Sequence, residues 1–340
     1  MGGTVRWPDG TQVSRPHTGE APALCSERAG ARRRTGGPQA PTRKGGFRVI
    51  PASFEYVVAH SLDETVGLLA KHGSDAKILS GGMSLIPAMK LRLAQPAFII
   101  DVNGVSGLAY IREEHGELRI GAMTRESALE RSSLVKHGYP ILFETARVIA
   151  DPLVRNRATI GGNLAHADPA NDHPATMLAL GATIVAHGPN GDRLIPIDEF
   201  FPSFFASALE PDEILTEIRI PAPGVRNGGA YIKFERKVGD YAIAAVAVNL
   251  TLDAHDTCIA ARIGLTNVTD VPARATRAEA FLVGRRITDQ AIADASRLAA
   301  HESDPKSDLR GSAEYKRDLV RVLAGRAIGR AVSRARGGSH

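Results

Sequence analysis

The sequence predicts an α+β fold in which two folded domains follow a long N-terminal extension. Three observations lead to this fold class. Short apolar runs alternate with helical patterns as far as a Pro- and Gly-rich stretch at 221–229, which we interpret as a linker. Beyond it, three strand-like runs are followed by three helical patterns. We therefore expect a disordered basic extension (1–48), a first domain (49–224), a second domain (225–333) and a disordered tail (334–340).

Composition limits the class of protein and its location. The chain has 340 residues, of which 43% are apolar and 23% charged, as in an ordinary globular protein. No apolar run approaches the roughly 20 residues that span a bilayer. The two cysteines, Cys25 and Cys258, form no CxxC pair and no iron–sulfur ligand set, and such low usage fits a reducing cytoplasm. Any iron–sulfur cluster that works with this chain must therefore lie on another chain.

The basic surplus of the chain lies in the extension. The formal net charge is +5, and residues 1–48 alone hold nine Lys and Arg against three acidic residues. A nucleic-acid-binding surface is therefore an alternative for the extension only, since the folded part has no surplus of basic residues. The extension is rich in Gly, Pro and Arg and lacks the apolar segment of a secretory signal, so we expect disorder there.

The first domain begins with a small β-α-β unit. Ser61-Leu62-Asp63-Glu64 matches a capping box, and the apolar stripe behind it predicts a helix that ends at Gly73. Short buried strands are expected at Ala76–Leu79 and Phe98–Val102, with a helix at Leu85–Leu93 between them.

The rest of the first domain mixes helices with strand pairs. The expected elements are a strand pair at 108–123 with its turn at Glu113–Gly116, helices near 125–136 and 140–150, a strand that runs through Thr159-Ile160 into Gly161-Gly162, a helix from Pro174 to Leu180, a hairpin of Thr183–His187 and Arg193–Ile197, and a strand at Glu213–Ile220.

The second domain has its strands first and its helices last. Strands are expected at Ala230–Arg236, Ala242–Leu252 and Cys258–Asn267, and helices near 276–283, 288–301 and 312–332. This order predicts an α+β domain in which helices pack on a three-stranded sheet.

Two glycine pairs carry the strongest functional signal. One lies in Ser80-Gly81-Gly82-Met83-Ser84, and the other, Gly161-Gly162, is followed by Asn163, Asp168 and Asp172. Each pair is expected to follow a strand and precede a helix, where backbone N–H groups can approach an anion without interference from Cβ atoms. Neither loop matches a GxGxxG or P-loop sequence. Either pair alone could be a plain turn, but together they predict a dinucleotide or flavin site.

Other polar residues near these loops leave alternatives open. His166, Asp168, Asp172 and His173 could bind a metal, although their spacing gives no helical i, i+4 pair and Asp168-Pro169 places a turn between them. Tyr241, in Gly239-Asp240-Tyr241, could stack on a planar cofactor or cover a domain junction. No Ser/His/Asp triad or paired acid–base set stands out.

Long runs of the chain resemble one known family, the FAD-binding medium subunits of molybdenum hydroxylases. Within it the likeness is greatest to the medium subunits of aerobic carbon monoxide dehydrogenases. The resemblance covers about Val49 to Val332, and it implies a vanillyl-alcohol-oxidase-type (PCMH-type) FAD-binding domain in two α/β subdomains, about 49–105 and 106–224, plus a C-terminal flavoprotein domain. The matching runs are SGGMSLIPAMKLRLAQP, IADPLVRNRATIGGNLAHADPANDHPA, KVGDYAIAA, LTNV and DLRGSAEYK.

The resemblance also implies the residues that would bind FAD. The diphosphate would lie on a first loop (Ser80, Gly81, Gly82, Met83, Ser84) and a second loop (Thr159, Ile160, Gly161, Gly162, Asn163). Asp172 would contact the cofactor, and Tyr241 would lie beside the isoalloxazine ring. Met83 stands where the family more usually has His or Gln, which matters little if the backbone binds. His166, Asp168 and His173 have no assigned role.

The function implied by the resemblance is electron transfer within a heterotrimer, and two such heterotrimers would form the dimer. FAD would take electrons from the [2Fe-2S] clusters of a small subunit and pass them to an external acceptor such as a quinone. A large molybdopterin subunit would oxidise carbon monoxide. The alternatives are a xanthine-dehydrogenase-like hydroxylase for aromatic heterocycles or aldehydes, and a stand-alone FAD oxidoreductase of the same fold.

The resemblance further implies a cytoplasmic protein, which could associate with the inner face of the membrane through the complex. Family members begin near Val49, so we hypothesise that translation of the native chain starts there; sequencing of the native N-terminus would test this.

Overall fold

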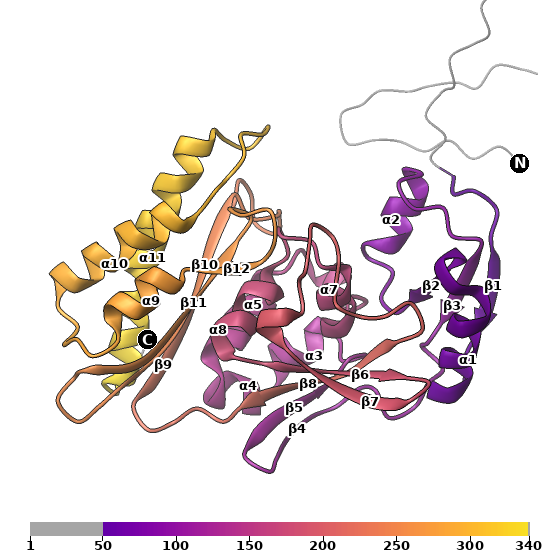
Figure 1. The fold of residues 1–340 in the computed structure, drawn as a ribbon, viewed down its shortest axis with the longest axis horizontal. Helices are drawn as coiled ribbons and strands as arrows, with labels where there is room; N and C mark the ends of the chain where they lie inside the picture. The colour runs from indigo at the N-terminus through magenta and orange to yellow at the C-terminus, as the bar shows by residue number, and fades with distance from the viewer. Residues whose placement is uncertain (1–49, 339–340) are drawn as a thin grey trace, which may run out of the picture. The chain divides into compact units, whose positions relative to one another are not determined.

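The computed structural model describes residues 50–338. The predicted disordered extension, 1–48, lies outside these residues. Figure 1 shows three β-sheets with helices packed around them. No helix within the described range is long and apolar enough to cross a membrane.

The first sheet has three parallel strands in the order β1-β3-β2. Its capping-box helix is confirmed: Ser61 Oγ accepts a hydrogen bond from the N–H of Glu64 at 3.1 Å, and the helix ends at Gly73, where φ is 52°. Because parallel strands end at the same edge, the residues that follow β2 and β3 lie side by side. The elements are β1 (Glu55–Val58), α1 (Leu62–His72), a 3₁₀ turn (Gly73–Asp75), β2 (Ala76–Leu79), α2 (Leu85–Lys90) and β3 (Phe98–Asp101).

The second sheet has five antiparallel strands in the order β4-β5-β8-β6-β7. The turn between its first two strands places His115 at φ 54° and Gly116 at φ 76°, as a tight two-residue hairpin requires. The strands are β4 (Ile111–Glu114), β5 (Glu117–Gly121), β6 (Thr183–Gly188), β7 (Gly191–Pro196) and β8 (Ile214–Pro221).

Helices pack on this second sheet and share its core. The single helix expected near 125–136 is wrong, because Ser132 adopts an extended conformation and its hydroxyl caps a new helix by accepting from Val135 N–H at 3.3 Å. The core includes Leu118, Ile120, Leu129, Leu142, Ile160, Leu164 and Met177. The helices are α3 (Glu126–Arg131), α4 (Ser133–Gly138), α5 (Pro140–Val148), α6 (Pro152–Arg155), α7 (Ile160–His166) and α8 (Asp172–Leu180), and a 3₁₀ turn follows at Ile197–Glu199.

The third sheet belongs to the C-terminal part and has the order β12-β11-β10-β9. The three expected strands form β9 to β11, and the short β12 adds a fourth. The last helix, α11, extends to Ala335, past the expected start of the tail at 334. The elements are β9 (Asn227–Phe234), β10 (Ala244–Leu252), β11 (Cys258–Thr266), β12 (Ala273–Arg274), α9 (Thr276–Leu282), α10 (Asp289–Glu302) and α11 (Ala313–Ala335).

Glycines let helices approach both faces of this third sheet. β9 begins inside the expected linker, and a Cβ on its Gly228 would lie 2.7 Å from the backbone nitrogen of Ala335 on α11. On the other face, a Cβ on Gly264 would lie 2.9 Å from Cα of Ala175 on α8. Figure 1 shows α9 to α11 on one side of these strands and α5 and α8 on the other. Helix α8 is buried from Asp172 to Ala179, because it packs on the second and the third sheet at once.

Candidate functional site

The structure brings the two glycine pairs together, although about 80 residues separate them. Ser80 Oγ lies 3.1 Å from Thr159 Oγ1. A Cβ on Gly81 would lie 2.8 Å from Cα of Ala158 and still closer to the carbonyl oxygen of Arg157, and a Cβ on Gly162 would lie 2.7 Å from Ser80 Oγ. A Cβ on Gly81 would meet backbone atoms, which cannot move aside, so the close approach requires glycine there, whereas the atoms nearest to a Cβ on Gly162 belong to side-chain hydroxyls, which can rotate.

The first loop, residues 80–84, connects β2 to α2 as expected. Gly82 has φ of 74°, a conformation that favours glycine. Among residues 50–338, nothing accepts a hydrogen bond from the backbone N–H groups of Gly82, Met83 and Ser84. The Met83 side chain is 37% exposed, so it does not cover the loop. The loop therefore offers backbone donors to a ligand.

The second loop differs from its prediction: Thr159-Ile160 is not a strand, and Gly161-Gly162 does not end one. The two glycines lie in the first turn of α7, and Thr159 is the N-cap, with its hydroxyl accepting from Gly162 N–H at 3.1 Å. This cap outweighs the β-propensity of Thr and Ile. The other N–H groups of this turn also have acceptors in the protein: Ile160 and Gly161 donate to the carbonyls of Thr124 and Ala122 at 3.1 and 3.0 Å, and Asn163 donates to that of Thr159 at 2.9 Å. The second loop therefore offers side-chain groups to a ligand and no free backbone donor.

Asn163 provides an independent test of whether a ligand fits here. Its side-chain oxygen is buried and has no hydrogen-bond partner within the described part of the chain. Its backbone oxygen accepts from Asn171 Nδ2 at 2.9 Å, so the residue is held in place. A buried amide oxygen without a partner costs free energy, and a ligand donor would remove that cost. The residues of the two loops thus fit a cofactor with a diphosphate and hydroxyl groups, such as FAD.

Asp172 is buried in a contact between the two domains. Its Oδ2 accepts from Lys233 Nζ at 3.0 Å and its Oδ1 accepts from the Tyr231 hydroxyl, both on β9. Lys233 Nζ also donates to the carbonyl of Val148 at 3.0 Å. Burial raises the pKa of Asp172, and Lys233 opposes this rise. The expected cofactor contact of Asp172 stays a prediction, and the structure adds two partners that local sequence patterns did not indicate.

Tyr241 lies in the loop between β9 and β10 and is 43% exposed. The guanidinium carbon of Arg310 lies 5.8 Å from its ring centroid. Burial, together with the charges of Asp168 and Asp172, raises the pKa of its hydroxyl. Gly239 lets the loop approach the turn between α5 and α6, since a Cβ there would lie 2.8 Å from the carbonyl oxygen of Ala150. The position is compatible with the expected stacking on a flavin.

The three unassigned residues have structural partners. Burial lowers the pKa of His166, whose ring packs edge-on against Phe205 with centroids 5.3 Å apart. Asp168 Oδ1 accepts from Ala170 N–H at 2.9 Å and forms a turn. His173 Nε2 lies 2.7 Å from Glu126 Oε2, and both side chains are fully buried. In the range 50–338, no group of three or more His, Cys, Asp or Glu side chains is arranged to hold a metal ion.

The sequence did not predict a role for two polar residues near the loops, Asn103 and Arg125. Asn103 Nδ2 donates to the carbonyl of Ser80 at 2.9 Å, and Arg125 Nη2 donates to Asn103 Oδ1 at 2.6 Å. Parallel pairing of the strands could have indicated Asn103, because it follows β3 where Ser80 follows β2. No local pattern indicates Arg125.

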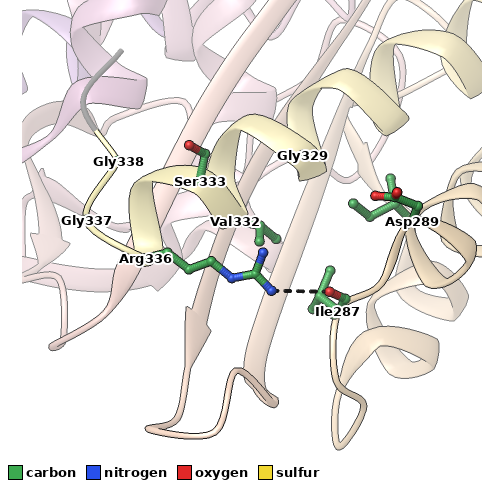
Figure 2. A pocket seen from close by; sticks show the side chains of 9 residues that line it. Ile287, Asp289, Gly329, Val332, Ser333, Arg336, Gly337 and Gly338 are labelled. Atoms are coloured by element: carbon green, nitrogen blue, oxygen red, sulfur yellow. Dashed lines mark hydrogen bonds between the residues drawn. The ribbon is translucent and has the colours of Figure 1, made fainter.

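Two pockets lie away from all of these residues. The pocket in Figure 2, of about 500 Å³, lies between the end of α11 and the start of α10, where Arg336 Nη2 donates to the carbonyl of Ile287 at 3.3 Å. A second pocket, of about 790 Å³, lies beside the linker 221–224. Neither is lined by a residue of the two glycine loops.

Comparisons with known proteins show the family of this chain. Residues 52–223 match the family described as the FAD binding domain in molybdopterin dehydrogenase. Residues 229–331 match the CO dehydrogenase flavoprotein C-terminal domain. The chain therefore belongs to the FAD-binding flavoprotein family of the molybdopterin dehydrogenases, and it is an oxidoreductase subunit.

Curated relatives and solved structures cover nearly the whole folded chain. The carbon monoxide dehydrogenase medium chain of Afipia carboxidovorans is 45% identical over 85% of this chain and 100% of the relative. The 6-hydroxypseudooxynicotine dehydrogenase complex subunit alpha of Paenarthrobacter nicotinovorans is 40% identical over 84% and 97%. A structure of the carbon monoxide dehydrogenase of Hydrogenophaga pseudoflava matches with a TM-score of 0.82 and 46% identity, over 84% of this chain and 99% of that chain. The resemblance and the fold inferred from the sequence are thereby confirmed.

Proposed function

We propose that this chain is the FAD-carrying medium subunit of a heterotrimeric molybdenum hydroxylase that oxidises carbon monoxide. The observation that carries the proposal is the contact of the two glycine loops, where the N–H groups of Gly82 to Ser84 and the side-chain oxygen of Asn163 have no partner among residues 50–338. The similarity to carbon monoxide dehydrogenase medium chains supports the choice of substrate.

The proposed roles of the residues combine the resemblance with the geometry of the two loops. Backbone N–H groups of the first loop bind the diphosphate, and the second loop lies against it through the contact of Thr159 with Ser80. Tyr241, from the C-terminal domain, lies against the isoalloxazine ring. The ion pair between Lys233 on β9 and Asp172 on α8 holds the C-terminal sheet against α8. FAD itself accepts and donates the electrons. The residues proposed to contact FAD are Ser80, Gly81, Gly82, Met83, Ser84, Thr159, Ile160, Gly161, Gly162, Asn163, Asp172 and Tyr241.

The partners in this proposal are a small [2Fe-2S] subunit and a large molybdopterin subunit, assembled as a dimer of heterotrimers. The chain has only two cysteines, too few for an iron–sulfur ligand set, so electrons would come from clusters on another subunit. The proposed acceptor is a quinone. We place the complex in the cytoplasm, in contact with the inner face of the membrane.

The test is isolation of the complex from its native cells through a tag on this chain. We expect bound FAD, iron, acid-labile sulfide and molybdenum, together with two further polypeptides, and oxidation of carbon monoxide with an artificial acceptor. Colourless protein that gains no flavin when FAD is added would overturn the FAD assignment. FAD-containing protein that purifies alone would favour a stand-alone oxidoreductase.

A second candidate keeps the complex but changes the substrate. Relatives in the same family act in 6-hydroxypseudooxynicotine dehydrogenase, and the quinoline 2-oxidoreductase of Pseudomonas putida matches at 34% identity with a TM-score of 0.79. A purified complex that oxidises an aromatic heterocycle or an aldehyde, and leaves carbon monoxide untouched, would support this candidate.

A further inference from the structure

We infer that Arg125 and Asn103 are positioning residues, which together hold the two glycine loops at the separation that the FAD diphosphate needs. This inference rests on the proposed FAD site. Both residues lie outside the two loops, and we call the pair the Arg125–Asn103 brace.

The brace is attached to the first loop through Asn103. Its Nδ2 donates to the carbonyl of Ser80 at 2.9 Å. The carboxylate of Asp101 fixes the orientation of this amide, since Oδ1 accepts from Asn103 Nδ2 at 2.6 Å and from Asn103 N–H at 2.8 Å. The amide oxygen of Asn103 therefore points away from Asp101 and is free to accept a different donor.

That donor is Arg125, which also binds the backbone just before the second loop. Arg125 Nη2 donates to Asn103 Oδ1 at 2.6 Å, and Nη1 donates to the carbonyl of Arg157. The backbone next to Arg125 binds the same segment, since the N–H of Glu126 donates to the carbonyl of Ala158 at 3.1 Å. A planar guanidinium fixes the angle between its two hydrogen bonds, so one side chain links the backbone at the start of the second loop to the amide that holds the first loop.

The acceptors of the brace lie where the loops touch. The carbonyl of Arg157 is the group nearest to Gly81, and Ser80 contributes both the carbonyl bound by Asn103 and the hydroxyl that meets Thr159. Without the brace, the Ser80–Thr159 contact would remain as the polar link between the loops in the described structure. A single hydroxyl pair allows rotation, whereas the brace fixes the position of both backbones.

The charge of the brace suits an anion between the loops. Arg125 is partly buried, and burial together with the charge of Arg157 lowers its pKa. Asp101 is the carboxylate that interacts with both guanidinium groups. Two guanidinium groups and one carboxylate give this cluster a net positive charge, which a diphosphate would balance.

The test measures FAD binding by the full chain after removal of its flavin. The variants are Arg125→Met, Asn103→Ala and the double variant, with Arg321→Met as a matched control on the exposed side of α11, where Arg321 pairs with Asp318. We expect Arg125→Met and Asn103→Ala each to weaken FAD binding about tenfold or more, as loss of a charge-assisted hydrogen bond would. The double variant should bind FAD with about the affinity of whichever single variant binds it less tightly, because both changes break the same linkage.

Arg125→Lys keeps the positive charge of the side chain but removes the planar arrangement of its N–H donors. An ammonium group lacks the planar fork, so we expect affinity between those of the wild type and Arg125→Met. Wild-type affinity in Arg125→Lys would show that charge alone matters and would overturn the brace. So would unchanged affinity in Arg125→Met, or losses that add in the double variant.

A purely structural role is excluded by the melting temperature of the flavin-free protein. We expect the variants to melt within about 2 °C of the flavin-free wild type, so that unfolding does not account for the loss of FAD affinity. A large drop without flavin would overturn the inference. Failure of the wild type to bind FAD would instead overturn the proposed function, so the two failures are distinguishable.

Discussion

At the scale of single residues, Gly81 determines whether the two loops can touch. A Cβ at this position would meet the backbone of Arg157 and Ala158, which cannot move aside as a flexible side chain can. The same argument applies to Gly162 against Ser80, although a hydroxyl there has more freedom to rotate. These contacts explain why glycine is needed even where φ is ordinary.

Gly81→Ala should separate the loops and abolish most FAD binding. Overpacking of this kind costs about 1–3 kcal/mol, so the melting temperature should also fall. Gly67→Ala is the matched control, because nothing lies within 4 Å of a Cβ at Gly67 in the middle of α1, and the change should stabilise the protein by about 0.5–1 kcal/mol. Flavin content and thermal melts of both variants would check this; equal FAD binding by both would contradict it.

Lys233→Met should destabilise the protein by about 3–5 kcal/mol, because it leaves the buried carboxylate of Asp172 without its ammonium partner. The loss should depend on pH. Burial already raises the pKa of Asp172, and removal of Lys233 raises it further, so the folded state then holds a proton that the unfolded state has released. Stability of the variant should therefore fall as pH rises above the unfolded pKa.

Urea unfolding at about pH 5 and about pH 8 would measure this difference, with the larger loss at the higher pH. The double variant Asp172→Asn/Lys233→Met is the control, and its unfolding free energy should lose the extra pH dependence. A loss in Lys233→Met that is the same at both pH values would show that Asp172 does not titrate.

At the scale of elements, the start of α7 shows how one side chain changes the structure of a loop. Thr159 caps the helix and also touches Ser80 of the first loop. A single hydroxyl therefore stabilises the helix end and the contact between the loops. The hydroxyl of Ser132 has a similar effect on α4, since it divides one helical pattern into two helices.

Thr159→Val should lower stability by about 1 kcal/mol through loss of the N-cap and should weaken FAD binding as well. Thr159→Ser keeps the hydroxyl and should restore most of both properties. Thermal melts and FAD titrations of the two variants would check this. Equal losses in Thr159→Ser and Thr159→Val would mean that the methyl group matters and the hydroxyl does not.

The sequence could predict most elements but only part of the site. Strands such as Ala76–Leu79 and the capped helix α1 follow from local patterns, and the structure confirms both. The strand predicted at Thr159-Ile160 is wrong, because the Thr159 N-cap stabilises a helix there by more than the β-propensity of Thr and Ile favours a strand. The partners of Asp172, Tyr231 and Lys233, lie about 60 residues further along the chain, and local periodicity carries no information about such contacts.

At the scale of the whole molecule, the basic charge and the flavin site lie in different parts of the chain. The extension holds the surplus of Lys and Arg, whereas the residues proposed to bind FAD lie between 80 and 241. Truncation of the extension should therefore remove the basic surplus and leave FAD binding intact.

A chain that begins at Val49 should keep the FAD affinity and melting temperature of the full chain. Salt-sensitive retention of the full chain on a polyanion matrix should be lost on this truncation. Flavin titration and chromatography at two salt concentrations would measure both. Loss of FAD binding by the truncated chain would show that the extension contributes to the flavin site.

Helix α8 has a consequence for how this protein can be divided. It packs on the second and the third sheet at once, so it belongs to two cores. A cut at the linker 221–229 would leave the C-terminal sheet without α5 and α8, with the apolar face around Ala245 and Ala247 uncovered. The C-terminal part is therefore not an independent module: a chimera that exchanges it with a relative must exchange the matching faces of α5 and α8 too, and recombination at the linker alone should yield insoluble protein.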